Sequence, residues 1–160
     1  VMDFGCGEKA TFLKSIEKKK KKGYGIDYKL QDYAKGKLEL RKMKVGKHIP
    51  LADESIDLIT MFAVLEHIDD PDPFMKEFHR VLKKGGKLAL TTPDKRSQGL
   101  LEFLAYKLKV INEEEIRDHK IYYNKKMLID LCKKHGFAVV KHKHFQFGLN
   151  NFLVAKKKTP

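Results

Sequence analysis

Short apolar runs alternate with amphipathic stretches along most of the chain. The apolar runs suit buried strands, and the amphipathic stretches repeat apolar residues every three or four positions, as helices that cover a sheet do. The expected strands span residues 1–4, 24–27, 38–40, 56–62, 87–92, 137–147 and 151–156. The expected helices span residues 10–21, 71–82, 98–110 and 125–135, with one helical turn at 30–34 and a loop at 111–123. This order predicts a single α/β domain over residues 1–160, with a mostly parallel sheet flanked by helices.

A pair of glycines joins the first expected strand to the first expected helix. Gly5 and Gly7 can bring the backbone close to a ligand, because glycine has no Cβ and tolerates positive φ. The second strand ends in Asp27, which lies 27 − 7 = 20 positions beyond Gly7. At this separation in a strand-turn-helix-strand unit, a carboxylate meets the ribose hydroxyls of a bound nucleoside. The first segment therefore predicts a nucleotide-binding site.

The glycine motif alone fits two kinds of cofactor. A dinucleotide site needs a third glycine, so that the helix packs tightly and its N-terminus holds the pyrophosphate. Lys9 or Ala10 occupies that place here. Asp3 precedes the glycines, where a carboxylate repels a phosphate but suits a ligand that carries an amino group and no phosphate.

The order Asp3-x-Gly5-x-Gly7 resembles the first motif of the class I S-adenosylmethionine-dependent methyltransferases. In that family the first acid lies near the methionine amino group, the glycines face the cofactor, and the acid after the second strand holds the ribose. The resemblance implies a Rossmann-like sheet and S-adenosylmethionine as the cofactor. The residues expected at the cofactor are Asp3, Gly5, Cys6, Gly7, Asp27, Tyr28 and Phe62.

Three further stretches extend the resemblance. Residues 49–59 are similar to a Leu-Pro-Phe-like turn followed by Ser-Phe-Asp and a strand, and residues 65–71 carry the Leu-Glu-His, acid and proline order frequent in methyltransferases of the ubiquinone-biosynthesis type. Residues 77–88 resemble the helix-turn-strand signature of this small-molecule branch, the type 11 methyltransferase domain. The resemblance implies an antiparallel last strand in a C-terminal hairpin at 137–156, and a substrate-side insertion at 93–123.

The chain departs from the family pattern at two places. Relatives often place an acid after the third strand to meet the adenine amino group, but residues 44–47 contain none. Backbone groups or apolar packing, for example by Tyr28, are expected to replace it. The chain also begins within the first strand, so the helical N-terminal cover that relatives place over the substrate is expected to be missing.

Two histidines are the candidates for catalysis. Methyl transfer from a sulfonium depends mainly on positioning, but a hydroxyl acceptor also benefits from a general base. His119 is the first candidate, because it lies in a polar segment and the adjacent Asp118 could orient its ring and raise its pKa. His67 is the second, because it follows the strand at 56–62. The acids beside His67 have no identifiable further ligand in the sequence, so no metal site is predicted.

Charge and cysteine content set the remaining limits. The net charge is +13, from 34 lysines and arginines against 21 acids. Lysines are spread along the chain with few aromatics between them, which indicates a solvated surface and permits a nucleic-acid partner without favouring one. The two cysteines, Cys6 and Cys132, indicate a reducing cytoplasm. No apolar run approaches the roughly 20 residues that span a bilayer, and the oligomeric state is left open.

The combined pattern predicts methyl transfer from S-adenosylmethionine to a small molecule, or to a lipid- or sugar-linked metabolite. The main alternative is an RNA- or protein-modifying methyltransferase, which the net charge motivates. A nicotinamide-dependent oxidoreductase is less favoured, because of Asp3 and the absent third glycine. A cofactor-binding domain without catalysis is a further alternative, motivated by the missing N-terminal cover.

Overall fold

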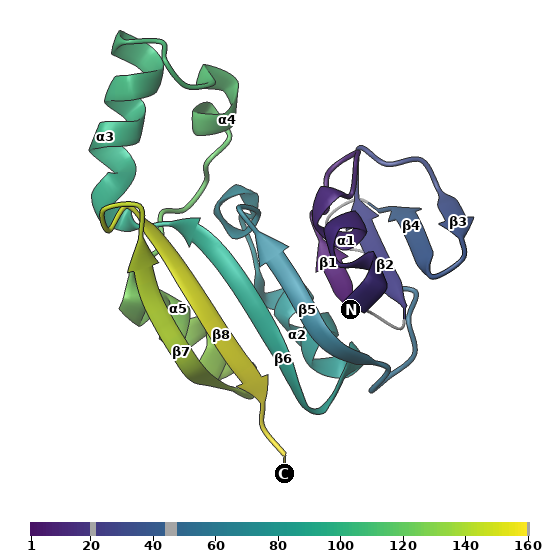
Figure 1. Cartoon of the computed structure of the whole chain (residues 1–160). Helices are drawn as coiled ribbons and strands as arrows, with labels where there is room; N and C mark the ends of the chain where they lie inside the picture. Colours follow the sequence, from purple (N-terminus) through teal and green to yellow (C-terminus); the bar gives the residue numbers. More distant parts are fainter. Residues whose placement is uncertain (20–21, 44–47, 160) are drawn as a thin grey trace.

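One mixed sheet organises the molecule. The computed structural model describes residues 1–19, 22–43 and 48–159. The described strands are β1 Met2–Phe4, β2 Gly23–Asp27, β3 Tyr33–Lys35, β4 Leu38–Lys42, β5 Ile56–Phe62, β6 Leu82–Pro93, β7 Phe137–Phe145 and β8 Asn150–Lys157. They form an eight-stranded sheet in the order β3-β4-β2-β1-β5-β6-β8-β7 (Figure 1). This arrangement places β1, which carries the glycine motif at its end, in the interior of the sheet.

Most of the sheet is parallel, as the sequence predicts. Strands β4, β2, β1, β5 and β6 pair in parallel, and β8 pairs antiparallel with both β6 and β7. The last strand is therefore antiparallel within a C-terminal hairpin, and this prediction is confirmed. Because the five parallel strands share one direction, their carboxyl ends lie at one edge of the sheet, where open α/β sheets bind ligands.

The helical turn expected at 30–34 is wrong. Tyr33–Lys35 forms the edge strand β3, which pairs antiparallel with β4 through Tyr33 opposite Leu40 and Lys35 opposite Leu38. A tight turn at residues 36–37 folds the chain back on itself, so the strand pairing overrides the weak local helical pattern.

Helices flank the sheet at the positions that the apolar periodicity predicts, with different lengths. The described helical segments are α1 Thr11–Ser15, η1 Glu17–Lys19, η2 Leu65–His67, α2 Asp72–Val81, η3 Lys95–Ser97, α3 Gln98–Glu102, the π-helical η4 Phe103–Lys107, α4 Glu113–Arg117 and α5 Lys125–Lys134. The helix expected at 10–21 is shorter than predicted, and residues 20–21 lie outside the described part of the chain. The segment expected as a loop at 111–123 contains the short helix α4.

Alternation along β1 separates two apolar clusters. Met2 and Phe4 belong to the main core, where the ring of Phe4 lies 5.1 Å from Phe74 and 5.2 Å from Phe78 of α2. The second cluster includes Leu13 of α1, with Val1 packed against it. Since successive side chains of a strand point to opposite faces, α1 and α2 cover opposite faces of the sheet.

The insertion at 93–123 leaves the sheet at the end of β6. Figure 1 shows α3 rising from this end, with the chain returning through α4 before it enters α5. Among the described residues no helix is long and apolar enough to cross a membrane, in line with the sequence prediction.

Candidate functional site

The loop after β1 is fastened to the end of β2. The backbone N–H groups of Gly5 and Cys6 both donate to the carbonyl of Ile26, at 2.7 and 3.2 Å. The N–H of Gly7 donates to Oδ2 of Asp27 at 2.9 Å, and the N–H of Lys29 donates to Oδ1 at 2.9 Å. The fold therefore brings Asp27 against the glycine loop, and its contact with the ribose, expected from the 20-residue spacing, stays a prediction.

The two glycines of the loop have different surroundings. Both have left-handed backbones, with φ of +77° at Gly5 and +67° at Gly7. A Cβ on Gly5 would lie 2.2 Å from Cγ2 of Val64, whereas a Cβ on Gly7 would meet no atom of the described structure within 4 Å. Gly5 therefore lets the loop pack against the segment after β5, and Gly7 leaves open space beside the loop, as a bound cofactor requires.

Asp3 is a buried carboxyl beside this loop. Its side chain accepts a hydrogen bond of 2.6 Å from the hydroxyl of Thr60 on β5. The pKa of Asp3 is raised to about 6, mainly by burial and to a smaller extent by the nearby charge of Asp27, whereas the Thr60 hydrogen bond acts in the opposite direction. A cationic ligand such as an ammonium group would compensate this buried negative charge.

The remaining predicted cofactor residues differ in their contacts. Phe62 ends β5, and its ring meets Phe12 of α1 edge-on at 5.3 Å between centroids. Burial raises the pKa of the Cys6 thiol to about 12, so this side chain is not a ready nucleophile. Tyr28 is 55 % exposed, with the ammonium of Lys29 5.4 Å from its ring centroid. The stretch 44–47, which lacks the adenine acid, lies outside the described residues.

The two candidate histidines lie together, although they are far apart in sequence. The ring centroids of His67 and His119 are 4.9 Å apart, in an edge-to-face arrangement. The backbone N–H groups of Lys120 and Ile121 donate to the carbonyl of Glu66 at 2.7 and 3.2 Å. These bonds attach the insertion to the segment that follows β5, and they place both histidines at the carboxyl edge of the sheet.

The role expected for Asp118 is wrong. Its Oδ2 lies 3.0 Å from Nδ1 of His67, and not against His119. The pKa of His119 is lowered rather than raised, because burial and the neighbouring His67 outweigh the attraction of Asp118. His119 therefore favours its neutral form near pH 7.

Several polar residues of this cluster were not predicted as site residues. The carboxyl oxygen Oε2 of Glu66 and the hydroxyls of Tyr122 and Tyr123 are buried without a hydrogen-bond partner among the described residues. Burial raises the pKa of both tyrosines to about 12, so both stay protonated. Their position beside His119 in the sequence was the signal that could have identified them.

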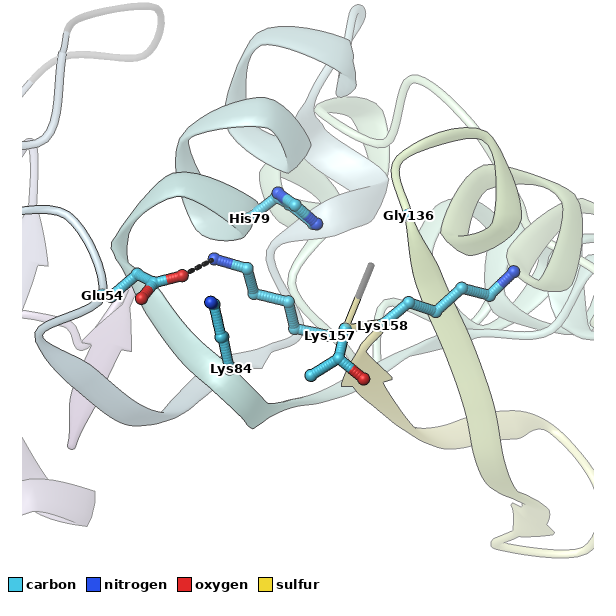
Figure 2. Close-up of a pocket in the computed structure, with 7 residues that line it drawn as sticks. Glu54, His79, Lys84, Gly136, Lys157 and Lys158 are labelled. Atoms are coloured by element: carbon cyan, nitrogen blue, oxygen red, sulfur yellow. Dashed lines mark hydrogen bonds and ion pairs between the residues drawn. The ribbon is translucent and has the colours of Figure 1, made fainter.

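A separate cavity of about 430 Å³ lies at the other edge of the sheet (Figure 2). Figure 2 shows Glu54 and Lys157 paired there, and the Lys157 ammonium also donates to the carbonyl of Leu82 at 2.7 Å. Lys84 and His79 line the same cavity. Because this edge carries the amino ends of the parallel strands, the cavity is remote from the glycine loop and does not serve as its ligand site.

Solved structures share the whole fold. A Haloferax volcanii protein, solved in complex with the Trm112 methyltransferase activator, has a TM-score of 0.77 and 15 % sequence identity, covering 99 % of this chain and 82 % of that chain. At this identity the likeness establishes the fold alone.

Sequence relatives carry methyltransferase names. A probable S-adenosylmethionine-dependent methyltransferase of Mycolicibacterium smegmatis is 29 % identical over 101 residues, covering 59 % of this chain and 38 % of the relative. A ubiquinone/menaquinone biosynthesis C-methyltransferase of Campylobacter jejuni is 27 % identical over 130 residues, covering 70 % of this chain and 54 % of the relative. The chain thus spans about half the length of such relatives, or less.

A family profile described as a methyltransferase domain matches residues 1–142. The match covers the glycine loop, Asp27 and the whole histidine cluster. With the relatives above, it confirms S-adenosylmethionine as the cofactor that the sequence predicts. The chain belongs to the methyltransferase-domain family, within the class I S-adenosylmethionine-dependent methyltransferases.

Proposed function

We propose that this protein transfers the methyl group of S-adenosylmethionine to a small molecule, or to a lipid- or sugar-linked metabolite. The observation that carries this proposal is the polar cluster of Glu66, His67 and His119 beside the cofactor loop. Val64 packs on Gly5, and the cluster begins two residues later in the chain. An acceptor held at the cluster would lie next to the cofactor.

The residues expected around the cofactor support a cofactor bound with its methionine part near Asp3 and its ribose near Asp27. Asp3 suits the ammonium group of the methionine part, and Asp27 suits the ribose hydroxyls, because its oxygens retain acceptor capacity beyond the N–H groups of Gly7 and Lys29. Phe62, at the end of β5, borders the methionine end of the cofactor. In the sequence it lies after both acids and before both histidines. Gly5 and Cys6 shape the loop, and Tyr28 is proposed to pack on the adenine.

The acceptor half supplies positioning and a place for the proton. The methyl group leaves the sulfonium as a bond forms to an oxygen, nitrogen or carbon of the acceptor, and the acceptor gives up a proton. His119 and His67 are the proposed acceptor contacts, and a neutral imidazole can take the proton of a hydroxyl. Alignment of acceptor and sulfonium supplies most of the rate, since the sulfonium already activates the methyl group.

Transfer of a radiolabelled methyl group tests the proposal. The protein is incubated with S-adenosylmethionine labelled in the methyl group and with separated metabolite, RNA and protein fractions. We expect label in the metabolite fraction, and calorimetric binding of S-adenosylhomocysteine with no binding of NAD. Label confined to RNA or protein would replace the proposed acceptor class, and binding of NAD alone would overturn the proposal.

The net charge of +13 favours one alternative, an RNA-modifying methyltransferase. RNA binding through phosphate contacts weakens steeply with salt. Tight and strongly salt-dependent RNA binding, together with label in RNA, would support this alternative over a small-molecule acceptor.

A further inference from the structure

Three side chains of metal-ligand type meet at the junction between η2 and the insertion. Glu66, His67 and His119 each bring one donor atom to within 4.8 Å of the other two. Glu66 and His67 are adjacent in η2, and His119 is held beside them by the hydrogen bond from Lys120 to the Glu66 carbonyl. No third ligand is visible in the sequence, because only the folded chain brings His119 to this place.

The carboxyl of Glu66 is buried with one oxygen unpartnered. The residue is 1 % exposed, and its Oε2 has no hydrogen-bond partner within the described part of the chain. The same holds for Nδ1 of His119. Burying polar atoms without partners is costly, and a buried carboxylate costs far more unless a cation faces it. A bound cation would satisfy the carboxylate and both imidazoles at once.

We propose that Glu66, His67 and His119 bind a divalent first-row transition metal ion, with zinc as the best match. Two imidazoles and one carboxylate form a set that zinc accepts while it keeps one position open for a further ligand. Softer ions prefer thiolates, and magnesium and calcium prefer oxygen alone.

The surroundings fit this donor set. Zinc ligands at about 2.1 Å from the metal lie roughly 3.4 Å from one another. Because the three donor atoms lie within 4.8 Å of one another, they would move together by at most about 1.4 Å on binding. A carboxylate usually contacts a metal-bound histidine and orients its ring. Asp118 lies within reach of this role, with Oδ2 at 3.0 Å from Nδ1 of His67, and Nδ1 has no hydrogen-bond partner among the described residues.

Metal binding itself does not depend on the proposed methyl transfer, but its consequence for the acceptor rests on that function. One imidazole nitrogen cannot both bind a metal and accept a proton. A metal at this cluster would therefore make His119 a ligand rather than a base, and the open coordination position would face the acceptor side.

Titration of chelator-treated, dialysed protein with ZnCl₂ tests the site, and the visible absorption of a Co²⁺-loaded sample reports the coordination. We expect one equivalent of metal per chain. His119→Ala and Glu66→Gln should each weaken binding by at least about 100-fold. His142→Ala is the matched control, because His142 pairs with Asn151 and His144 outside the cluster, and it should bind as the unaltered protein does.

Absence of stoichiometric binding would overturn the proposal, as would equal weakening in His142→Ala. If His119→Ala does not fold, His119→Gln and the Co²⁺ absorption of the unaltered protein decide the matter: an octahedral, all-oxygen spectrum would overturn the site. S-adenosylhomocysteine is titrated into the same samples. Metal binding without cofactor binding would defeat the proposed function and leave the metal site standing, and the reverse result would do the opposite.

Discussion

Thr60 donates a 2.6 Å hydrogen bond to Oδ1 of Asp3, from directly opposite it in the parallel pair of β5 and β1. Asp3 is only 4 % exposed, and burial raises its pKa to about 6 from the ordinary 3.8. The hydroxyl orients a carboxyl whose ionised form the fold disfavours. The effect of the Asp3 charge on the stability of the fold can therefore be measured separately from its effect on cofactor binding, both by substitution and by a change of pH.

Asp3→Asn should stabilise the unliganded protein while weakening cofactor binding. At pH 7 the buried carboxylate is ionised against its shifted pKa, and its removal should raise the free energy of unfolding by about 1–2 kcal/mol. Thr60 can still donate to the amide oxygen of the new side chain. Chemical denaturation measures the stability, and calorimetry with S-adenosylhomocysteine measures the binding. Asp130→Asn, on the exposed side of α5, should change neither quantity.

Cofactor binding should weaken as the pH falls below about 6. Above that value the carboxylate of Asp3 is ready to meet an ammonium, whereas below it binding must first release a proton, and the dissociation constant should rise roughly tenfold per pH unit. The stability contribution runs the other way: because the folded pKa is raised, Asp3 makes the protein more stable as the pH falls from about 6 to 3.8. A pH series with Asp3→Asn should lose both dependences, and a shared pH profile in the two proteins would contradict the role of Asp3.

Gly5→Ala and Gly7→Ala should fail in different ways. At Gly5 the new methyl meets Val64 as well as left-handed strain, so unfolding should become easier by about 2–4 kcal/mol. At Gly7 the space is open, and only the strain of about 1 kcal/mol should appear. Yet Gly7→Ala should weaken binding of S-adenosylhomocysteine at least about tenfold, because the methyl enters the space assigned to the cofactor. Unchanged binding in Gly7→Ala would move the cofactor away from this loop.

Arg80→Ala should destabilise the fold by about 2–3 kcal/mol. Its guanidinium donates to Glu77, to Asp53 and to the carbonyls of Ile49 and Leu51, and so joins the loop before β5 to α2. Thermal and urea unfolding measure the loss.

A matched comparison is Lys83→Ala, which removes an exposed ion pair with Asp57 and should lower the free energy of unfolding by about 0.5 kcal/mol or less.

The contribution of Arg80 should also depend on pH. The hydrogen bond from Arg80 lowers the pKa of Glu77 to about 2. The stability from this pair is therefore complete above the ordinary pKa of 4.5 and is lost as the pH falls towards 2. The difference in the free energy of unfolding between the unaltered protein and Arg80→Ala should become smaller over that pH range. If Arg80→Ala and Lys83→Ala lose the same free energy of unfolding at neutral pH, Arg80 does not stabilise the fold as proposed.

The pattern of apolar residues, and the glycines and prolines that end its segments, predict the central sheet well. Buried strands need continuous apolar runs, and the helices that cover them need one apolar face. The strand β5 and the helix α2 lie where the pattern of apolar residues places them, and the family and the cofactor are confirmed. The edge strand β3 was missed, since all three of its residues are exposed and no apolar alternation marks it. The short helix α4 was missed because only one of its five residues, Ile116, is apolar, so no apolar periodicity marks it.

The candidate site likewise has a part that local sequence pattern predicts and a part that it does not. Spacing within one βαβ unit predicts that Asp27 meets the ribose of a bound nucleoside. The structure places its carboxylate against the glycine loop, where the N–H of Gly7 donates to it. The meeting of His67 and His119 depends on hydrogen bonds between distant segments, which local pattern does not encode. The acceptor, the N-terminal cover, the cytoplasmic location and the roles of the individual site residues stay predictions.

The two hydrogen bonds from Lys120 and Ile121 to the carbonyl of Glu66 use main-chain atoms alone. These two bonds do not depend on which side chains Lys120 and Ile121 carry, so both positions can change during evolution, to residues other than proline, without losing them. The cofactor half, built on β1 and β2, takes no part in this attachment. Acceptor preference can thus diversify among descendants of such a chain while methyl-donor recognition is inherited unchanged.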